Sequence, residues 1–342
     1  MAGTDAHANN SWLNPCSAVG KRVFVLVGLV ILIMATATVA TAYLQTRKPL
    51  TRIIPDAQVI EQVVPPRYLF SIYHVNEPFG VATSPDGNNI YVTELGGERE
   101  LKVFDRSGNL VNSSNPTDSV VPGRAPLYIS VNADGMVFVA DRNRHGISIY
   151  SPDGKYLREF LPNGDSNFVW NPIGSTFDKD GNFYVTDVTG GQHRVLVFNP
   201  SGALIREFGK QGTGPGEFMF PNGVAVASDG RIFVANGNLG RVDIFNNAGS
   251  FLSTFAQGTS AGSVGIPRGL AIQGDRLYVV DTAGHMVQVF SIVREKPTYL
   301  FSLGGQGNKD GQLSFPNGVA LDVTGRVYVA DRKNNRVQVW SY

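Results

Sequence analysis

The sequence predicts an all-β protein: a six-bladed β-propeller preceded by one transmembrane helix. Two observations support this fold class. Residues 220–255 contain four short apolar stretches separated by tight-turn sequences, and valine alternates with alanine from Val224 to Ala227, the period of a pleated strand. The same unit occurs six times, at steps of about 46 to 49 residues. Because one four-stranded unit cannot bury both of its faces, the copies must stack on one another.

The repeats can be aligned at two positions in each unit. A Pro-x-Gly motif or its equivalent opens the innermost strand, and an acidic or amide side chain ends the second strand. From the first unit to the sixth, the second and third residues of the Pro-x-Gly motif are Phe79-Gly80, Leu127-Tyr128, Ile173-Gly174, Asn222-Gly223, Arg268-Gly269 and Asn317-Gly318. The second strands are expected at residues 89–94, 136–141, 182–187, 231–236, 276–281 and 326–331.

This pattern resembles the NHL-repeat family of six-bladed β-propellers. The resemblance is strongest at residues 315–340 and 208–236, and it covers roughly residues 67–342. It implies the fold, but it says little about function, because such propellers serve as enzymes, RNA binders, sensor domains and scaffolds.

Composition narrows the function classes. The 342 residues carry a formal net charge of +1, which points to no nucleic-acid partner. The single cysteine excludes an intrachain disulfide, and five histidines leave little scope for a zinc site of ordinary spacing. We therefore expect a monomer without a cofactor.

The N-terminal region predicts a membrane anchor. Residues 1–22 are a short polar segment, and residues 23–42 form an uncharged run of 20 residues, long enough to span a bilayer as a helix. Lys21-Arg22 before the run and Ala-x-Ala sequences at its end also match a cleavable signal peptide. We favour an uncleaved single-pass anchor with an extracytoplasmic propeller, joined by a proline-containing linker at residues 43–66.

The two ends of the propeller predict how its ring closes. Residues 67–73 resemble the outermost strand of a blade but precede the first blade. The sixth blade, which ends at Tyr342, lacks its outermost strand. The N-terminal strand is therefore expected to complete the last blade and remove an open sheet edge.

The middle residues of the Pro-x-Gly motifs are the candidate ligand-binding residues. In a four-stranded meander they lie at the same end of the ring as the loops after the second strands. Three are apolar and three are polar: Phe79, Leu127, Ile173, Asn222, Arg268 and Asn317. A ligand or peptide of mixed character would fit such a channel mouth. The alternative is that these side chains only pack between blades.

Two other recurrent sets favour structural roles. The acidic or amide residues that end the second strands are expected to accept backbone N–H bonds in the turn that follows each second strand. Their repetition in every blade argues against catalysis, because an active site is usually asymmetric. Three histidines occupy equivalent loops, but those loops lie on separate blades, too far apart to share a metal ion. The two sets are Glu94, Asp141, Asp187, Asn236, Asp281 and Asp331, and His145, His193 and His285.

The resemblance also allows a test for enzymatic function. Some NHL-like propellers are peptide-amidating lyases whose zinc-binding histidines stand in the Pro-x-Gly slots, and none of the six slots here holds histidine. The function expected is a membrane-anchored, extracytoplasmic, non-catalytic binding or scaffold module for a protein or small ligand. The alternatives are an extracytoplasmic metal-dependent lyase or lactonase, and an intracellular RNA- or protein-binding propeller.

Overall fold

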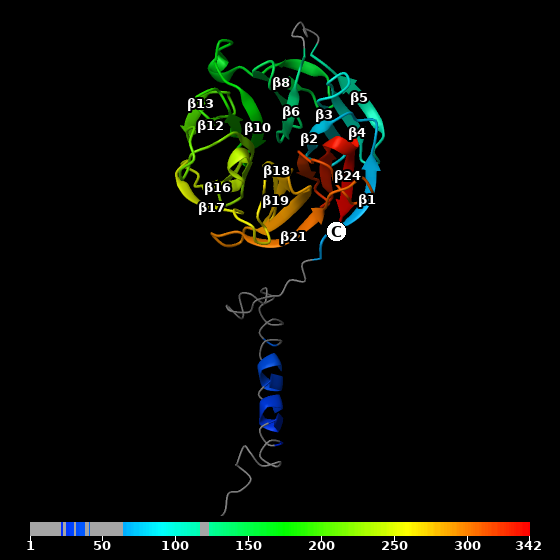
Figure 1. Cartoon of the computed structure of the whole chain (residues 1–342), viewed down its shortest axis with the longest axis vertical. Helices are drawn as coiled ribbons and strands as arrows, with labels where there is room; N and C mark the ends of the chain where they lie inside the picture. The colour runs from blue at the N-terminus through cyan, green and yellow to red at the C-terminus, as the bar shows by residue number, and fades with distance from the viewer. Residues whose placement is uncertain (1–21, 23–24, 31, 38–40, 42–63, 117–122) are drawn as a thin grey trace, which may run out of the picture. The chain divides into compact units, whose positions relative to one another are not determined.

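The computed structural model describes residues 22, 25–30, 32–37, 41, 64–116 and 123–342 (Figure 1). The chain divides into two units, residues 1–63 and residues 64–342. In the first unit, residues 25–30 and 32–37 are helical. No helix in the described part of the chain combines the length and apolar character needed to cross a bilayer. The rest of the predicted span at 23–42, and most of segments 1–22 and 43–66, lie outside the described residues.

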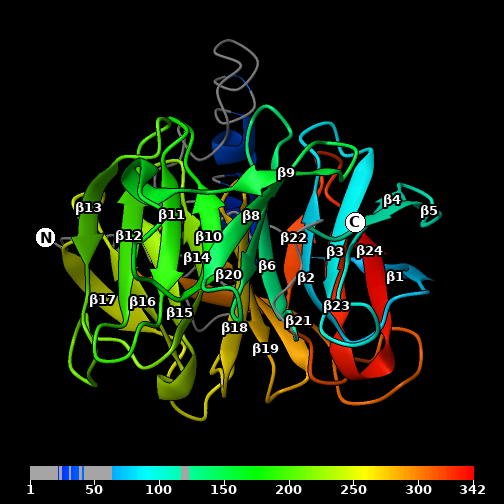
Figure 2. The same ribbon diagram turned by 90° about the horizontal axis from the view of Figure 1, so that it is seen from above.

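The second unit is a six-bladed β-propeller, as predicted. Six antiparallel four-stranded sheets form a ring, with the first strand of each blade innermost (Figures 1 and 2). The first three blades are β2 (Pro78–Thr83), β3 (Asn89–Glu94), β4 (Leu101–Asp105) and β5 (Leu110–Ser114); β6 (Pro126–Val131), β7 (Val137–Asp141), β8 (Gly146–Tyr150) and β9 (Tyr156–Glu159); and β10 (Pro172–Phe177), β11 (Phe183–Asp187), β12 (Arg194–Phe198) and β13 (Leu204–Phe208).

Blades 4 to 6 follow the same plan. They are β14 (Pro221–Val226), β15 (Ile232–Asn236), β16 (Arg241–Phe245) and β17 (Phe251–Phe255); β18 (Pro267–Gln273), β19 (Arg276–Asp281), β20 (Met286–Ser291) and β21 (Thr298–Gly304); and β22 (Val319–Leu321), β23 (Val327–Asp331), β24 (Arg336–Ser341) and β1 (Arg67–Ile72). Short 3₁₀ turns η2 (Pro162–Gly164), η3 (Gly237–Leu239) and η4 (Arg332–Asn334) lie in the connections.

The N-terminal strand closes the ring, which confirms the prediction made from the spare strand. β1 pairs antiparallel with β24 as the outermost strand of blade 6, with Arg67 opposite Ser341 and Ile72 opposite Val337. Ile72 is buried in an apolar cluster that joins blade 6 to blade 1. Strands from the two ends of the propeller therefore share one sheet, and that sheet has no missing strand.

Backbone packs against backbone around the propeller axis, and glycine makes this possible. A Cβ added to Gly80 would lie 2.4 Å from the carbonyl oxygen of Leu127, and one added to Gly174 would lie 2.2 Å from that of Asn222. Gly223, Gly269 and Gly318 meet the next blade in the same way. None of these motif glycines has a positive φ, so backbone conformation does not require them. They are required because a side chain would clash with the backbone of the next blade.

The innermost strands are irregular at the Pro-x-Gly motif. In blades 1 to 5, the pairing with the second strand shifts register between the motif proline and the residue three positions later, for example between Pro78 and Val81. Such irregularities re-aim side chains at the end of a strand. The middle residue of each motif is thereby placed outside the regular alternation of its strand.

Candidate functional site

A cavity of about 290 Å³ lies at one end of the propeller. Five of the six predicted residues line it: Phe79, Leu127, Ile173, Asn222 and Arg268. Leu95 and Val188, which directly follow second strands, line it as well. The starts of the innermost strands and the loops after the second strands therefore meet at the same end of the ring, as the meander topology predicts.

Asn317, the sixth predicted residue, is not among the residues that line this cavity. Its side chain is 2% exposed, and its Nδ2 donates a hydrogen bond of 3.0 Å to the carbonyl oxygen of Phe315. In blade 6 the innermost strand begins only at Val319, after the motif. The Asn317 amide therefore holds the chain segment that enters its own blade.

The polar edge of the cavity is centred on Arg268. Its Nη1 donates a hydrogen bond of 2.8 Å to Oδ1 of Asn222, whose Nδ2 in turn donates to the carbonyl oxygen of Phe220 at 2.9 Å. Arg142 and Arg332 add two more guanidinium groups to the lining. The edge is thus rich in hydrogen-bond donors, and Asn222 fixes the orientation of Arg268.

Tyr128 is the residue of this region that sequence reasoning missed. It stands where the other five motifs have glycine. Its Cα therefore lies among the close backbone contacts that join neighbouring blades around the axis. The side chain is buried against Phe79, with ring centroids 5.0 Å apart at 68°. It belongs to an apolar cluster with Leu127, Ile173 and Val188. The tyrosine at a glycine position was the available clue.

The Tyr128 hydroxyl is buried and has no hydrogen-bond partner among the described residues. Burial raises the pKa of this phenol, and the positive charge of Arg268 opposes the shift only in part. Tyr128 therefore stays protonated at physiological pH and remains a hydrogen-bond donor. The Nε of Arg268 is likewise buried without a partner in the described structure.

The residues that end the second strands accept backbone N–H bonds, as predicted, but the bonds common to all six blades come from the segment that enters the blade and not from the turn after the second strand. Each accepts a backbone N–H from the segment that enters its own blade: Asp187 Oδ1 from Asn171 at 2.8 Å, Asn236 Oδ1 from Met219 at 2.8 Å, and Asp331 Oδ1 from Ser314 at 2.7 Å. These bonds fasten the connection between blades to the blade that follows.

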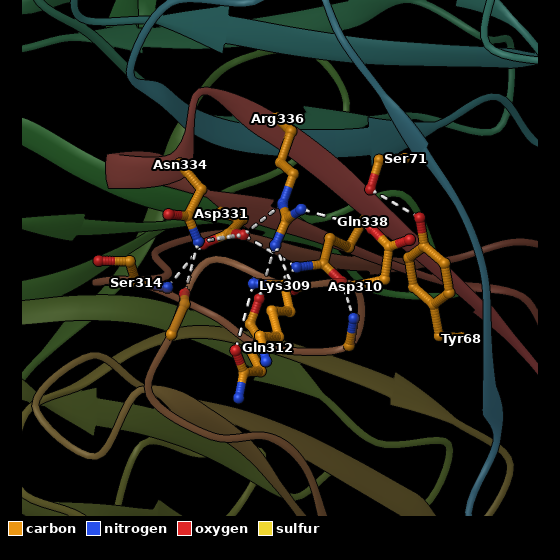
Figure 3. A network of polar contacts seen from close by, with 12 residues as sticks. Tyr68, Ser71, Lys309, Asp310, Gln312, Ser314, Asp331, Asn334, Arg336 and Gln338 are labelled. Carbon is orange, nitrogen blue, oxygen red and sulfur yellow. Dashed lines mark hydrogen bonds and ion pairs between the residues drawn. The ribbon is translucent and has the colours of Figure 1, made fainter.

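Arg336 strengthens this arrangement in blade 6 (Figure 3). Its Nε donates to Oδ2 of Asp331 at 2.8 Å, and its Nη2 donates to the carbonyl oxygens of Lys309 and Gln312 at 2.7 and 2.9 Å. Arg241 holds the corresponding glycine-rich loop of blade 4 through carbonyl oxygens of that loop. These guanidinium groups stabilise loops and do not line the cavity.

The three loop histidines occupy a position that needs a left-handed backbone. His145, His193 and His285 have φ of 52°, 25° and 55°, and the equivalent Gly240 and Asn335 have φ of 56° and 52°. Asparagine and glycine tolerate this conformation better than most residues, so the variation follows backbone geometry. The Nδ1 of His285 also accepts a hydrogen bond of 3.1 Å from the backbone N–H of Phe315, which lies in the segment that enters the next blade.

The Pro-x-Gly slots do not fit a zinc ion. They hold one phenyl ring, two aliphatic chains, two amides and a guanidinium, none of which is a usual zinc ligand. Within the described residues, no group of three or more His, Cys, Asp or Glu side chains is placed to hold a metal.

Family profiles match two parts of the propeller. A profile for the NHL repeat matches residues 313–340. A profile described as a 6-bladed beta-propeller matches residues 165–254. The chain carries an NHL repeat within a six-bladed β-propeller. The second match includes blade 4 with the glycine-rich loop that Arg241 holds, and the first covers strands β22 to β24 of blade 6.

Several known proteins are similar to this NHL-repeat propeller. Protein brain tumor of Drosophila melanogaster is 30% identical over 38% of this chain and 12% of that protein. NHL repeat-containing protein 3 of Mus musculus is 28% identical over 63% of this chain and 52% of that protein. Peptidyl-alpha-hydroxyglycine alpha-amidating lyase 2 of Drosophila melanogaster is 32% identical over 31% of this chain and 27% of that protein.

This chain thus spans at most about half the length of these relatives. Among solved structures, streptogramin B lyase matches 80% of this chain and 97% of its own, with a TM-score of 0.58 and 16% identity. At that identity the likeness concerns the fold alone.

Proposed function

We propose that this propeller is a non-catalytic binding module whose protein or small-molecule ligand enters the cavity at the channel mouth. The observation that supports it is the convergence of five predicted residues on one cavity of about 290 Å³. Phe79, Leu127 and Ile173 give it an apolar wall, while Asn222 and Arg268 give it a polar edge. A small apolar cavity with a few convergent polar groups is typical of a ligand site.

A fragment screen by thermal shift tests this proposal. Leu95→Trp should fill the cavity, because Leu95 is half-buried in its lining. Ser228→Trp is the matched control, because Ser228 is exposed in a hollow formed by turns at the other end of the innermost strands. Fragments that stabilise the original chain should lose their effect in Leu95→Trp and keep it in Ser228→Trp. The reverse pattern would place the binding surface at the other end.

We also propose that residues 23–42 anchor the chain in a membrane, with the propeller exported. Support comes from the uncharged run of 20 residues after Lys21-Arg22. The chain should remain with membranes after an alkaline wash, and a reporter active only outside the cytoplasm should work when fused after Tyr342. Release by the wash, with a new N-terminus near Thr38 or Tyr43, would instead indicate a cleaved signal peptide.

A lyase-type enzyme is the second candidate, favoured by the similarity to an amidating lyase. This candidate predicts a stoichiometric divalent metal in the purified chain, and it predicts that substitutions in the cavity remove the metal. Elemental analysis of the original chain and of Asn222→Ala distinguishes the two functions. The binding proposal predicts the same metal content in both.

A further inference from the structure

The residue before each motif proline has one of two backbone conformations. In blades 1, 4 and 6 its φ is positive, at 46° in Glu77, 57° in Phe220 and 48° in Phe315. In blades 2, 3 and 5 its φ is not positive. A bulky residue rarely adopts a positive φ, and a following proline favours extended backbone. Phe220 and Phe315 are therefore held in an unfavourable conformation.

A hydrogen bond to the preceding blade accompanies the positive φ. The strained residue donates its backbone N–H to a side chain in the loop after the preceding blade's second strand. These bonds join Glu77 to Oδ1 of Asn335 at 2.8 Å, Phe220 to Nδ1 of His193 at 3.4 Å and Phe315 to Nδ1 of His285 at 3.1 Å. In the other three blades the same N–H donates to the carboxylate that ends the blade's own second strand. Those bonds join Ala125 to Asp141 at 3.1 Å, Asn171 to Asp187 at 2.8 Å and Ile266 to Asp281 at 3.2 Å. Conformation and bond partner thus change together in all six blades.

His193 fastens Phe220 in two ways. Its buried ring packs on the ring of Phe220, with centroids 4.8 Å apart at 57°. Its Nδ1 lies 3.4 Å from the backbone nitrogen of Phe220 and 3.3 Å from the carbonyl oxygen of Phe218. Either tautomer of His193 therefore bonds to the segment that enters blade 4. His285 makes the same ring contact and the same N–H bond with Phe315.

The two strained phenylalanines differ in what they face. The side chain of Phe220 is 42% exposed and forms part of the lining of the mouth cavity. Phe315 is 46% exposed but is not among the residues that line this cavity. Strained residues cluster at ligand-binding sites, where the surrounding structure holds them in place. Phe220 is therefore the strained residue that a ligand in the cavity would contact.

The rest of the cavity lining suits a flat ring. Phe79 supplies a second aromatic side chain, and Leu127 and Ile173 supply an aliphatic wall. The guanidinium groups of Arg142 and Arg268 also belong to the lining, and such planar groups stack on aromatic faces. Because aromatic pairs gain more than their buried area alone provides, an aromatic ring fits this lining better than an aliphatic ring of the same size.

We propose that the mouth cavity binds an aromatic ring, that Phe220 selects this ring, and that His193 positions Phe220. The ring of the ligand packs on the exposed ring of Phe220 and lies among the apolar side chains of the cavity. This inference rests on the proposed binding function and specifies its ligand class. A small aromatic molecule and an aromatic side chain of a partner protein share this chemistry.

Saturation-transfer NMR titrations of the full-length chain in detergent test the ligand class. The first pair of neutral probes is benzamide and cyclohexanecarboxamide. The second pair is N-acetylphenylalanine amide and N-acetylcyclohexylalanine amide, which carry the same two rings on a peptide unit. In each pair the aromatic member should bind about two- to tenfold more tightly, the contribution of an aromatic pair. Uptake by detergent would give the opposite order, because the cyclohexyl ring is more apolar.

The same titrations identify the source of the ring. Tighter binding of N-acetylphenylalanine amide than of benzamide points to a protein side chain, and the reverse order points to a small molecule. If the aromatic member of each pair binds no more tightly than its cyclohexyl partner, the inference is wrong.

Two phenylalanine variants test the role of Phe220. Phe220→Leu keeps an apolar side chain and removes the ring, so the preference for aromatic probes should disappear. Phe315→Leu is the matched control, because Phe315 has the same conformation and the same histidine contact but does not line the cavity. It should keep the preference. Loss of the preference in both variants, or in neither, would contradict the role of Phe220.

Three histidine variants test positioning. His193→Ala removes the acceptor and the ring that hold Phe220, so it should weaken aromatic probes about as much as Phe220→Leu. His193→Asn should restore their binding, because asparagine makes the equivalent bond at Asn335. His285→Ala removes the same contacts from Phe315 and should leave binding unchanged. Equal weakening by the two alanine variants would indicate a general structural effect and overturn the positioning role.

The remaining outcomes separate the inference from the function on which it rests. If the two members of each pair bind equally and Leu95→Trp abolishes their binding, the mouth is a binding site without a preference for aromatic rings. If no probe binds and no fragment stabilises the chain, both the inference and the proposed function fail.

Discussion

The ring of Tyr68 meets that of Trp340 edge to face, with centroids 6.4 Å apart, across the strand pair that closes the propeller. One side chain comes from the first strand of the propeller and the other from the last. Both termini of the propeller therefore contribute to one blade, and removing either strand would expose the other's hydrogen-bonding edge.

A chain that begins at Pro66 should fold cooperatively, whereas one that begins at Asn76 should melt roughly 10 °C lower or aggregate. The shorter chain lacks the buried Ile72 and exposes the edge of β24. Calorimetry on the two chains measures the difference. Equal melting temperatures would mean that β1 contributes nothing to closure.

Gly223→Ala should destabilise the propeller by roughly 1–3 kcal/mol. The added Cβ would lie 2.5 Å from the carbonyl oxygen of Arg268 and 2.9 Å from the backbone nitrogen of Leu270, and backbone atoms cannot move aside cheaply. Gly190→Ala is the control, because nothing lies within 4 Å of its added Cβ. Urea denaturation should show a change of less than about 0.5 kcal/mol for the control. Equal effects of the two substitutions would contradict tight axial packing.

Arg336→Met should cost roughly 3–5 kcal/mol, because it leaves the fully buried carboxylate of Asp331 without its cation. Adding Asp331→Asn should recover part of this loss, so the two effects should not be additive. Arg158→Met, on the exposed outer strand of blade 2, provides the control. Strictly additive losses in the Arg336 and Asp331 variants would show that the pair is not coupled.

Glu77 should make the junction of blades 6 and 1 sensitive to acid. Hydrogen bonds from Lys333 and Arg332 lower the pKa of this carboxyl below its ordinary value of 4.5. Its contribution to stability is therefore present above the ordinary pKa and is lost as the pH falls through the lowered pKa of the folded state. Glu77→Gln should melt about 1–3 °C below the original chain at pH 7. Melting curves from pH 7 to pH 3 should converge, and a gap that persists at pH 3 would contradict this role.

The fold was largely predictable because each blade repeats the same local pattern. Alternating apolar residues and turn glycines located the second strands to within a residue, as at Asn89–Glu94 and Arg276–Asp281. Closure by residues 67–73 followed from counting outer strands. These features depend on local periodicity and on the need to pair every edge, and both are visible in one sequence.

The site was less predictable because it depends on where blades converge. Asn222 and Asn317 occupy the same motif position and make the same bond to the carbonyl oxygen two residues earlier, yet only Asn222 lines the cavity. Arg142 and Arg332 reach the cavity from loops whose direction the sequence does not specify. The sequence shows that Tyr128 replaces the glycine of the other motifs. That its hydroxyl is buried without a partner among the described residues depends on how the folded blades pack, and the sequence does not show it.

The order in which the chain is synthesised gives strand β1 an unusual history. Its partner at Val337 follows Ile72 by 265 residues. At synthesis rates of about 5–20 residues per second, β1 waits roughly 13 to 53 seconds for β24 to appear. During that interval five blades can form while the first-made strand has no sheet to join. The last event of folding therefore recruits the oldest part of the propeller, and a chaperone that shields residues 67–72 would act within this window.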